Sequence, residues 1–223
     1  MNELLNKYLD KNEKKEFLNI INPIISHEEF KRRMLKDFPH HGKISLSEHI
    51  LEVAILTYKM CKKKKNVNLK LAVYIAMMHD LYTVPWQNNK IKEKYFSNKH
   101  GFRHPLESVI NSINWYPQIY NDNDYKIIID GIIHHMYPLP VRVFNNKKLE
   151  LKNSELIKNV DEKYINEIKN SSKRHRLFNL SLSKSKYKEG QIVSYCDKKV
   201  SIKQISNIYD LISLLTGRNK NLR

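Results

Sequence analysis

The chain has 223 residues, which suits one domain, or one domain with an elaboration, and allows a substantial core. Hydrophobic residues make up 41% and aromatic residues 10%, a composition that excludes a disordered chain, and the 5 glycines and 7 prolines favour helices over a β-sandwich. The formal net charge of +17 favours anionic partners such as nucleotides or nucleic acid. Because the lysines are spread along the whole chain, however, the charge could equally serve only to solvate the surface.

Two cysteines, Cys61 and Cys196, are too few for a disulfide framework and lack the spacing of a zinc site. Cys196 lies in an apolar helical stretch and is interpreted as a buried thiol. The first fifteen residues lack the apolar core of a signal peptide, and no apolar run is long enough to span a bilayer. We therefore expect a soluble, cytoplasmic protein with no membrane partner.

The N-terminal extension, residues 1–38, is predicted to contain one or two short amphipathic helices. Pro23 is expected to break them and Pro39 to end them, because proline interrupts the helical hydrogen-bond pattern. The extension is treated as separate from the domain core that follows it.

Two helices are predicted after the extension. The first can be capped by Ser45 or Ser47, and its apolar residues follow three-and-four spacing, with His49 on or beside the inward face. The second covers residues 69–81 and is apolar on nearly every face, which is typical of a central helix in a bundle. It ends at the dipeptide His79-Asp80.

Two more helices are predicted in the middle of the chain. Residues 82–103 are interpreted as a polar loop, followed by a helix from Pro105 to Tyr116 with His104 at its mouth. Asp124 is expected to cap the next helix, Tyr125 to His135. Both helices therefore bring a histidine to one of their ends.

The C-terminal part is predicted to contain a lysine-rich inserted lobe or lid, residues 144–189, and a final helix over 191–215 that carries Asp197. The domain core would consist of residues 39–143 and 190–216. The sequence contains no convincing strand pair, no internal repeat and no glycine-rich phosphate loop. We therefore predict an all-α fold, a helical bundle with a basic inserted lobe.

Adjacent His79 and Asp80 at the end of a buried helix are hard to explain by packing, because a buried carboxylate costs several kcal/mol unless it is paired or binds a metal. Further histidines and, near the C-terminus, Asp197 lie on separate predicted helices. Antiparallel packing of such helices brings their ends together. Any one of these residues alone could be a structural residue. Imidazole and carboxylate ligands together suit divalent transition metals. The remaining histidines, interpreted as structural or surface residues, are His27, His40, His100 and His175.

Five sequence blocks resemble the HD-domain superfamily of metal-dependent phosphohydrolases, in particular small HD-domain proteins of low-GC Gram-positive bacteria. The blocks are HHGKISLSEHILEVA, AVYIAMMHDLYTVPW, KHGFRHPLESVINS, IIHHMYPLP and IVSYCDKKVS. The likeness covers roughly residues 35–143 and 190–205. The N-terminal extension and the inserted lobe depart from the compact form of that group, which leaves the substrate open.

The resemblance implies a centre of two divalent ions (Mn, Fe, Co, Ni or Zn) that is bridged by Asp80. The implied ligands are His49, His79, Asp80 and Asp197 for the first ion, and Asp80, His104 and His135 for the second. His135 is preferred to His134, because the related blocks have their ligand directly before Met and an aromatic-Pro-Leu stretch. His134 is left as an additional or supporting group. Asp80 and His79 are the predicted catalytic residues, and a hydroxide shared by the two ions is the predicted nucleophile.

The predicted function is hydrolysis of a phosphomonoester or phosphodiester bond in a nucleotide-like substrate. The alternative is a basic regulatory protein that binds nucleic acid or nucleotides on the same scaffold. Charged groups close to the ligand blocks could hold phosphate oxygens. These candidate substrate-binding residues are His41, Lys43, Arg103 and Arg142. Tyr82, Trp86 and Trp115 could stack on a base, although aromatic residues more often belong to the core.

Overall fold

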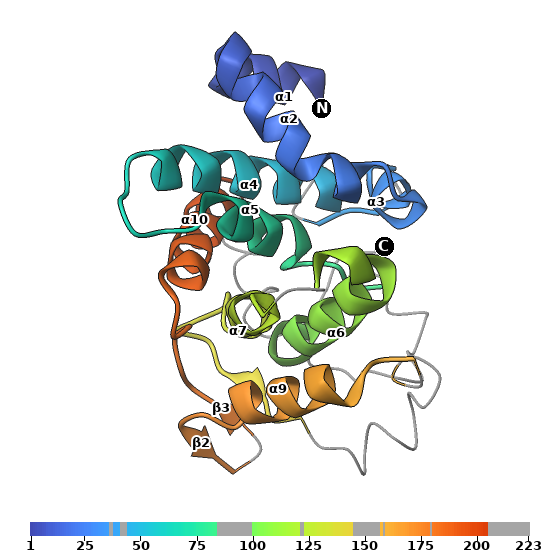
Figure 1. Cartoon of the computed structure of the whole chain (residues 1–223), viewed down its shortest axis with the longest axis vertical. Coiled ribbons are helices and arrows are strands. Elements are labelled where there is room, and N and C mark those ends of the chain that lie inside the picture. Colours follow the sequence, from blue (N-terminus) through green and yellow to red (C-terminus); the bar gives the residue numbers. More distant parts are fainter. Residues whose placement is uncertain are drawn as a thin grey trace, which may run out of the picture.

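The computed structural model confirms the all-α prediction, because helices form nearly all of the regular structure (Figure 1). It describes residues 1–35, 38–40, 44–83, 100–120, 123–144, 157, 159–178 and 180–204. The helices are α1 (Asn2–Tyr8), α2 (Lys11–Ile25), α3 (Glu28–Arg33), α4 (Leu46–Lys62), α5 (Leu69–Met78), α6 (His100–Trp115), the 3-10 helix η1 (Pro117–Ile119), α7 (Tyr125–Ile133), α9 (Glu162–Ser172) and α10 (Lys188–Gln204). In the described part of the chain no helix is long and apolar enough to cross a membrane.

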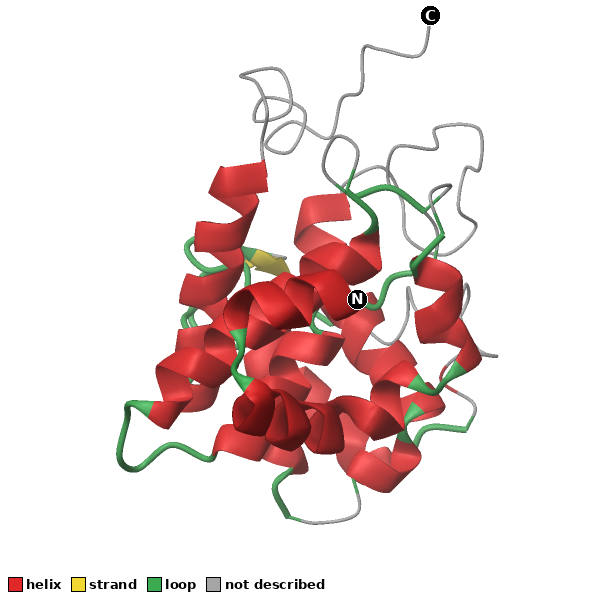
Figure 2. Ribbon diagram, turned by 90° about the horizontal axis from the view of Figure 1, so that it is seen from above, coloured by secondary structure: helices red, strands yellow, loops and turns green. Residues whose placement is uncertain are grey.

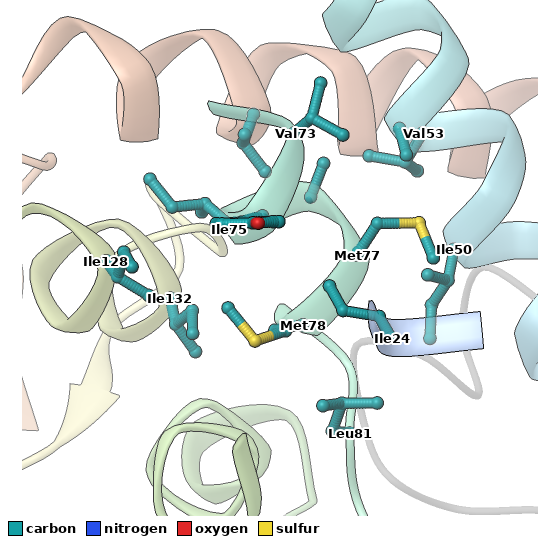
Figure 3. Packing of buried hydrophobic residues seen from close by; sticks show 14 of the residues in the cluster. Ile24, Ile50, Val53, Val73, Ile75, Met77, Met78, Leu81, Ile128 and Ile132 are labelled. Carbon is teal, nitrogen blue, oxygen red and sulfur yellow. The ribbon is translucent and has the colours of Figure 1, made fainter. Parts of the chain in front are cut away.

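Helix α5 lies at the centre of the bundle and packs against α4, α7 and α10. All of its residues from Leu71 to Met78 are buried, as the apolar sequence predicted. Figure 3 shows the α5 side chains between those of α4 and α7, with Met77 toward Ile50 and Met78 toward Ile132. Burial of each such side chain contributes about 1.5–3 kcal/mol, so the end of α5 is held rigidly.

Two glycines allow close approach between helices, of α10 to α7 and of α7 to α5. A Cβ atom added to Gly190 would lie only 2.7 Å from the Cα atom of Gly131, and one added to Gly131 would lie 2.7 Å from Cδ1 of Ile75. The backbone of Gly131 cannot move aside, so only glycine fits at position 190, whereas Gly131 leaves room for the Ile75 side chain of α5. This close packing brings the helix that carries Asp197 next to α5 and α7.

The N-terminal extension contains three helices rather than one or two, and they contribute to the same core. Phe17 and Phe30 are fully buried in the hydrophobic cluster that includes α4 and α5. Pro23 does not separate two helices, since it lies inside α2, two residues before that helix ends at Ile25. A proline so near the C-terminal end costs a single backbone hydrogen bond, which the core contacts of Ile21 and its neighbours offset. The predicted boundary between extension and core, at residue 38, stays a prediction.

Two details of the fold differ from the sequence prediction. Helix α6 begins at His100 and contains Pro105 in its interior, so residues 100–103 are helical rather than part of a polar loop. The helix tolerates this proline because the missing N–H would have bonded to the carbonyl of Gly101, in the first turn. The chain also forms a small antiparallel sheet in the order β1-β3-β2, although no strand pair was predicted. Its strands are β1 (Val141–Arg142), β2 (Arg176–Leu177) and β3 (Leu180–Ser181).

The sheet and α9 attach the predicted lobe to the rest of the molecule. Strand β1 packs against α6, and β3 pairs with β1 in the register Val141 to Ser181. Helix α9 packs against α7. Figure 2 shows how the helices surround one another while the strands occupy only a small part of the fold. Of the predicted final helix, residues 205–215 lie outside the described residues.

Candidate metal centre

The dipeptide His79-Asp80 directly follows the last residue of α5, where the buried helix fixes both side chains. His79 Nδ1 donates a hydrogen bond to the Ala76 carbonyl at 2.7 Å. A carbonyl oxygen can only accept, so this bond leaves the Nε2 atom of a neutral ring with its lone pair directed away from the helix. His79 is fully buried, and the side chain of Asp80 is almost fully buried.

The first group of candidate ligands joins the first turn of α4, the end of α5 and the middle of α10. Nε2 of His79 lies 3.4 Å from Nε2 of His49, and Oδ1 of Asp197 lies 3.2 Å from the His49 nitrogen and 3.7 Å from the His79 nitrogen. Two ligands bound to one transition ion at about 2.0–2.3 Å are roughly 3 to 4.5 Å apart. These three atoms therefore have the spacing of co-ligands.

Asp80 lies between this first group and a second one. Its Oδ2 atom is 3.7 Å from Nε2 of His49 and 3.5 Å from Nε2 of His79. Its Oδ1 atom is 3.1 Å from Nε2 of His104 and 3.5 Å from Nε2 of His135, and those two nitrogens are 3.0 Å apart. Oδ2 thus faces the first group and Oδ1 faces His104 and His135, which is the arrangement of a bridging ligand.

Several features of these residues fit a divalent cation. Oδ1 of Asp80 is buried and accepts no hydrogen bond of normal geometry. His135 Nδ1 donates to the Ile132 carbonyl at 2.7 Å, and His49 Nδ1 lies 2.8 Å from the side-chain oxygen of Gln204. The Nε2 lone pairs of neutral His49 and His79 therefore face each other at 3.4 Å, which is unfavourable unless a proton or a metal ion lies between them. Nitrogen and carboxylate donors together suit Mn, Fe, Co, Ni or Zn.

Electrostatics within the centre keep its carboxylates ionised. Burial raises the pKa of Asp80, but His79 and His104 outweigh burial and hold it well below its usual range; for Asp197, His49 and His79 have the same effect. Burial alone would lower the pKa of His79, yet the Asp80 and Asp197 carboxylates raise it to about 9. The carboxylates thus attract positive charge strongly. A divalent ion would satisfy that attraction and release the histidine proton on binding.

The neighbouring histidine of the pair, His134, faces away from the centre. Its ring lies beside the hydroxyl of Ser183 (3.2 Å from Nδ1) and the hydroxyl and carbonyl of Ser171 (3.2 Å each from Nε2). Burial lowers the pKa of His134 to about 4, so the ring is neutral. Of the two candidates, His135 is the one that lies with the predicted ligands, and His134 belongs to the contact between α7 and the lobe.

The predicted substrate-binding residues have different positions. Arg103 on α6 and Arg142 on β1 are both half-buried. Burial lowers the pKa of Arg103, and the positive charge of Arg142 lowers it further, which indicates that the two guanidiniums are neighbours. Nε of Arg103 is buried without a hydrogen-bond partner. Within the described residues no carboxylate pairs with either arginine. His41 and Lys43 lie outside the described residues, so their predicted roles stay predictions.

The aromatic residues considered for base stacking belong to the core where they are described. Tyr82 is fully buried, and its hydroxyl lies 2.9 Å from His40 Nδ1. Trp115 packs against the guanidinium of Arg33, 4.4 Å from the ring centre, and stacks on His27. Trp86 lies outside the described residues.

Sequence reasoning missed two polar residues that hold the turn after Asp80. Arg33 of α3 is fully buried and donates to the Tyr82 carbonyl at 2.6 Å. Glu107 of α6 is buried and accepts a hydrogen bond from the Thr83 backbone at 2.7 Å. A buried charge is costly without such partners, so both residues fix the geometry of the turn. Their sequence neighbourhoods contain no signal that separates them from surface charges on an amphipathic helix.

A family model described as "HD domain" matches residues 46–199, which is more than half of the chain. The chain therefore belongs to the HD-domain family, whose members are generally metal-dependent hydrolases. The matched range runs from α4 into α10 and contains all six candidate ligands. Comparison with curated proteins and with solved structures gives no match.

We predict that protein loaded with Mn²⁺ or Co²⁺ and freed of excess ion holds close to two metal equivalents per chain. His104→Ala is expected to lower this value to about one, because it removes a nitrogen of the second group and leaves the first group intact. Elemental analysis of both proteins measures the change, with the exposed His175 replaced by Asn as the control. A single equivalent that His104→Ala leaves unchanged would contradict the two-ion centre.

Proposed function

We propose that this HD-domain protein is a metal-dependent phosphohydrolase that cleaves a phosphomonoester or phosphodiester bond of a nucleotide-like substrate. The observation that carries the proposal is the position of Asp80, whose two carboxylate oxygens face separate groups of histidines. Divalent ions bound in such a centre lower the pKa of water to supply a nucleophile at neutral pH, and they accept charge from phosphoryl oxygens. Two ions are proposed because the Asp80 carboxylate lies between the two groups of candidate ligands and has one oxygen directed toward each.

The protein's own residues would contribute positioning and exclusion of water. The Nδ1 hydrogen bonds of His79 and His135 to backbone carbonyls fix each ring, so that the ligand geometry is set before substrate arrives. Asp80 is buried away from water, so the local dielectric constant is low and its interaction with a cation is stronger. These features support hydrolysis more than binding alone, since a regulatory scaffold has no need of a complete buried ligand set.

An anionic substrate is proposed from the arginine pair next to the centre and from the net charge of +17. Arg103 directly precedes His104, and Arg142 lies on the strand that packs against the same helix. Two neighbouring guanidiniums without a carboxylate partner among the described residues repel each other, and a phosphate group would relieve that repulsion. Arginine also forms paired hydrogen bonds with phosphate oxygens.

The test of the proposed function is a screen of metal-loaded protein against generic phosphatase and phosphodiesterase substrates, followed by a panel of nucleotides. Turnover that requires the added ion and disappears with chelator supports the proposal. A protein that binds metal but turns over none of these substrates would contradict it. Nucleic-acid binding with a steep salt dependence would then favour the regulatory alternative.

We predict that Arg103→Gln and Arg142→Gln each raise KM for the best substrate of the panel, with a smaller effect on kcat. Loss of one charge-assisted hydrogen bond costs about 1.5–3 kcal/mol, which corresponds to roughly 10- to 100-fold. Steady-state kinetics at constant ionic strength measure the change. Arg176→Gln, at an exposed position on β2, serves as the control. An unchanged KM in both variants would remove the arginines from the substrate site.

A further inference from the structure

His40 comes from a turn that lies before the residues matched by the family model. The turn is held by backbone hydrogen bonds, from His40 N to the Ile44 carbonyl at 2.9 Å and from Leu46 N to the Phe38 carbonyl at 3.1 Å. Leu46, which donates the second of these bonds, is the first residue of α4, the helix that carries His49. The backbone at His40 is therefore tied to the start of the helix that carries a candidate ligand.

The His40 ring lies at the metal centre rather than in the surrounding core. It packs against the ring of His49, with the ring centres 4.1 Å apart and the ring planes tilted by 35°. Its Nε2 atom is 3.7 Å from Oδ2 of Asp80, the same distance that separates Nε2 of His49 from that oxygen. One ligand atom each from His40, His49 and Asp80 lie within 4.8 Å of one another. This separation is too long for a hydrogen bond and suits two ligands of one ion.

The other nitrogen of His40 has the supporting contact that metal-binding histidines usually have. Nδ1 lies 2.9 Å from the buried hydroxyl of Tyr82, whose oxygen can accept the Nδ1 hydrogen. His79 and His135 use backbone carbonyls for the same purpose. With Nδ1 held by Tyr82, the Nε2 atom of His40 is directed toward the Asp80 carboxylate, which already faces the imidazoles of His49 and His79. A purely structural histidine would not need this orientation.

We propose that His40 is an additional ligand of the ion held by His49, His79, Asp80 and Asp197, with Tyr82 accepting its Nδ1 hydrogen. The inference rests on the proposed function in that it requires a metal centre. With His40 added, protein ligands nearly fill a six-coordinate shell around this ion. Fewer protein ligands would surround an ion held by His104, His135 and Asp80, so a substrate oxygen would find its open position on that side.

Co²⁺ is the probe for this inference, because its visible absorption reports the number and type of ligands. We expect His40→Ala to change the absorption of the Co²⁺-loaded protein and to weaken the binding of one equivalent by at least 10-fold in competition with a chelator. Tyr82→Phe should weaken the same equivalent by about 10- to 100-fold, the usual effect of losing a supporting hydrogen bond. His175→Asn is the control and should match the wild type.

Three outcomes separate the possibilities. A folded His40→Ala protein with the wild-type spectrum and affinity for both Co²⁺ equivalents overturns the inference and leaves the proposed function intact. Failure of the wild-type protein to bind Co²⁺ overturns the proposed function as well. If His40→Ala does not fold, His40→Gln preserves most of the side-chain volume, and the same two measurements on that variant decide the question.

Discussion

Replacing Asp80 with alanine is expected to abolish hydrolysis and to remove both metal equivalents. Its two oxygens lie 3.1–3.7 Å from histidine nitrogens of both groups, so one substitution disrupts both sites. The loss of rate should exceed the roughly 10²–10⁴-fold that is typical for removal of a single general acid or base. Turnover of the best panel substrate and elemental analysis measure the two effects, and circular dichroism checks the helical fold.

Asp197→Ala provides a matched comparison for Asp80→Ala. Asp197 contacts only the first group, at 3.2 Å from His49 and 3.7 Å from His79, so its removal should cost one equivalent rather than two. Asp80→Asn adds a variant of nearly unchanged volume that keeps a single carbonyl oxygen. Undiminished turnover in a folded Asp80→Ala protein that holds no metal would place the chemistry elsewhere in the molecule.

The part of the centre that sequence could predict lies on regular helices or directly after them. The apolar run of α5 predicted a buried helix, and the charged dipeptide at its end indicated a function because burial makes an unpaired carboxylate costly. The order of the other histidines and Asp197 placed them on separate helices. The structure brings all six predicted ligands together, although their binding of metal stays a prediction.

His40 was interpreted as a structural or surface residue, and its position at the centre could not be read from periodicity. It lies in a turn, where no hydrophobic pattern fixes the direction of a side chain. Its position depends on backbone hydrogen bonds between residues 38–40 and the start of α4. The strands were missed for a related reason, since two-residue strands are too short to show alternation.

A second polar cluster, centred on Asp130, attaches the lobe to α7. Asp130 is buried and accepts hydrogen bonds from Arg174 Nη2 at 2.6 Å, from Ser185 Oγ at 2.7 Å and from the Lys186 backbone at 2.8 Å. These three donors come from the segment between α9 and α10. His134, which caps the C-terminal end of α7, contacts that segment as well, and the next residue, His135, faces the metal centre. Helix α7 therefore connects the lobe to the candidate site.

Asp130→Asn is expected to destabilise the protein by about 3 kcal/mol, the lower end of the range for breaking a buried ion pair, because Arg174 keeps some contact with water. The amide would also present hydrogens to donors that need an acceptor. Urea unfolding followed by circular dichroism measures the change. Asp161→Asn on the same lobe is the control: this exposed N-cap of α9 should lose little, because asparagine caps helices as well as aspartate does. In the Asp130→Asn protein, backbone hydrogen exchange should increase first around residues 171–187. An unfolding midpoint equal to that of Asp161→Asn would show that the sheet and α9 hold the lobe without the Asp130 cluster.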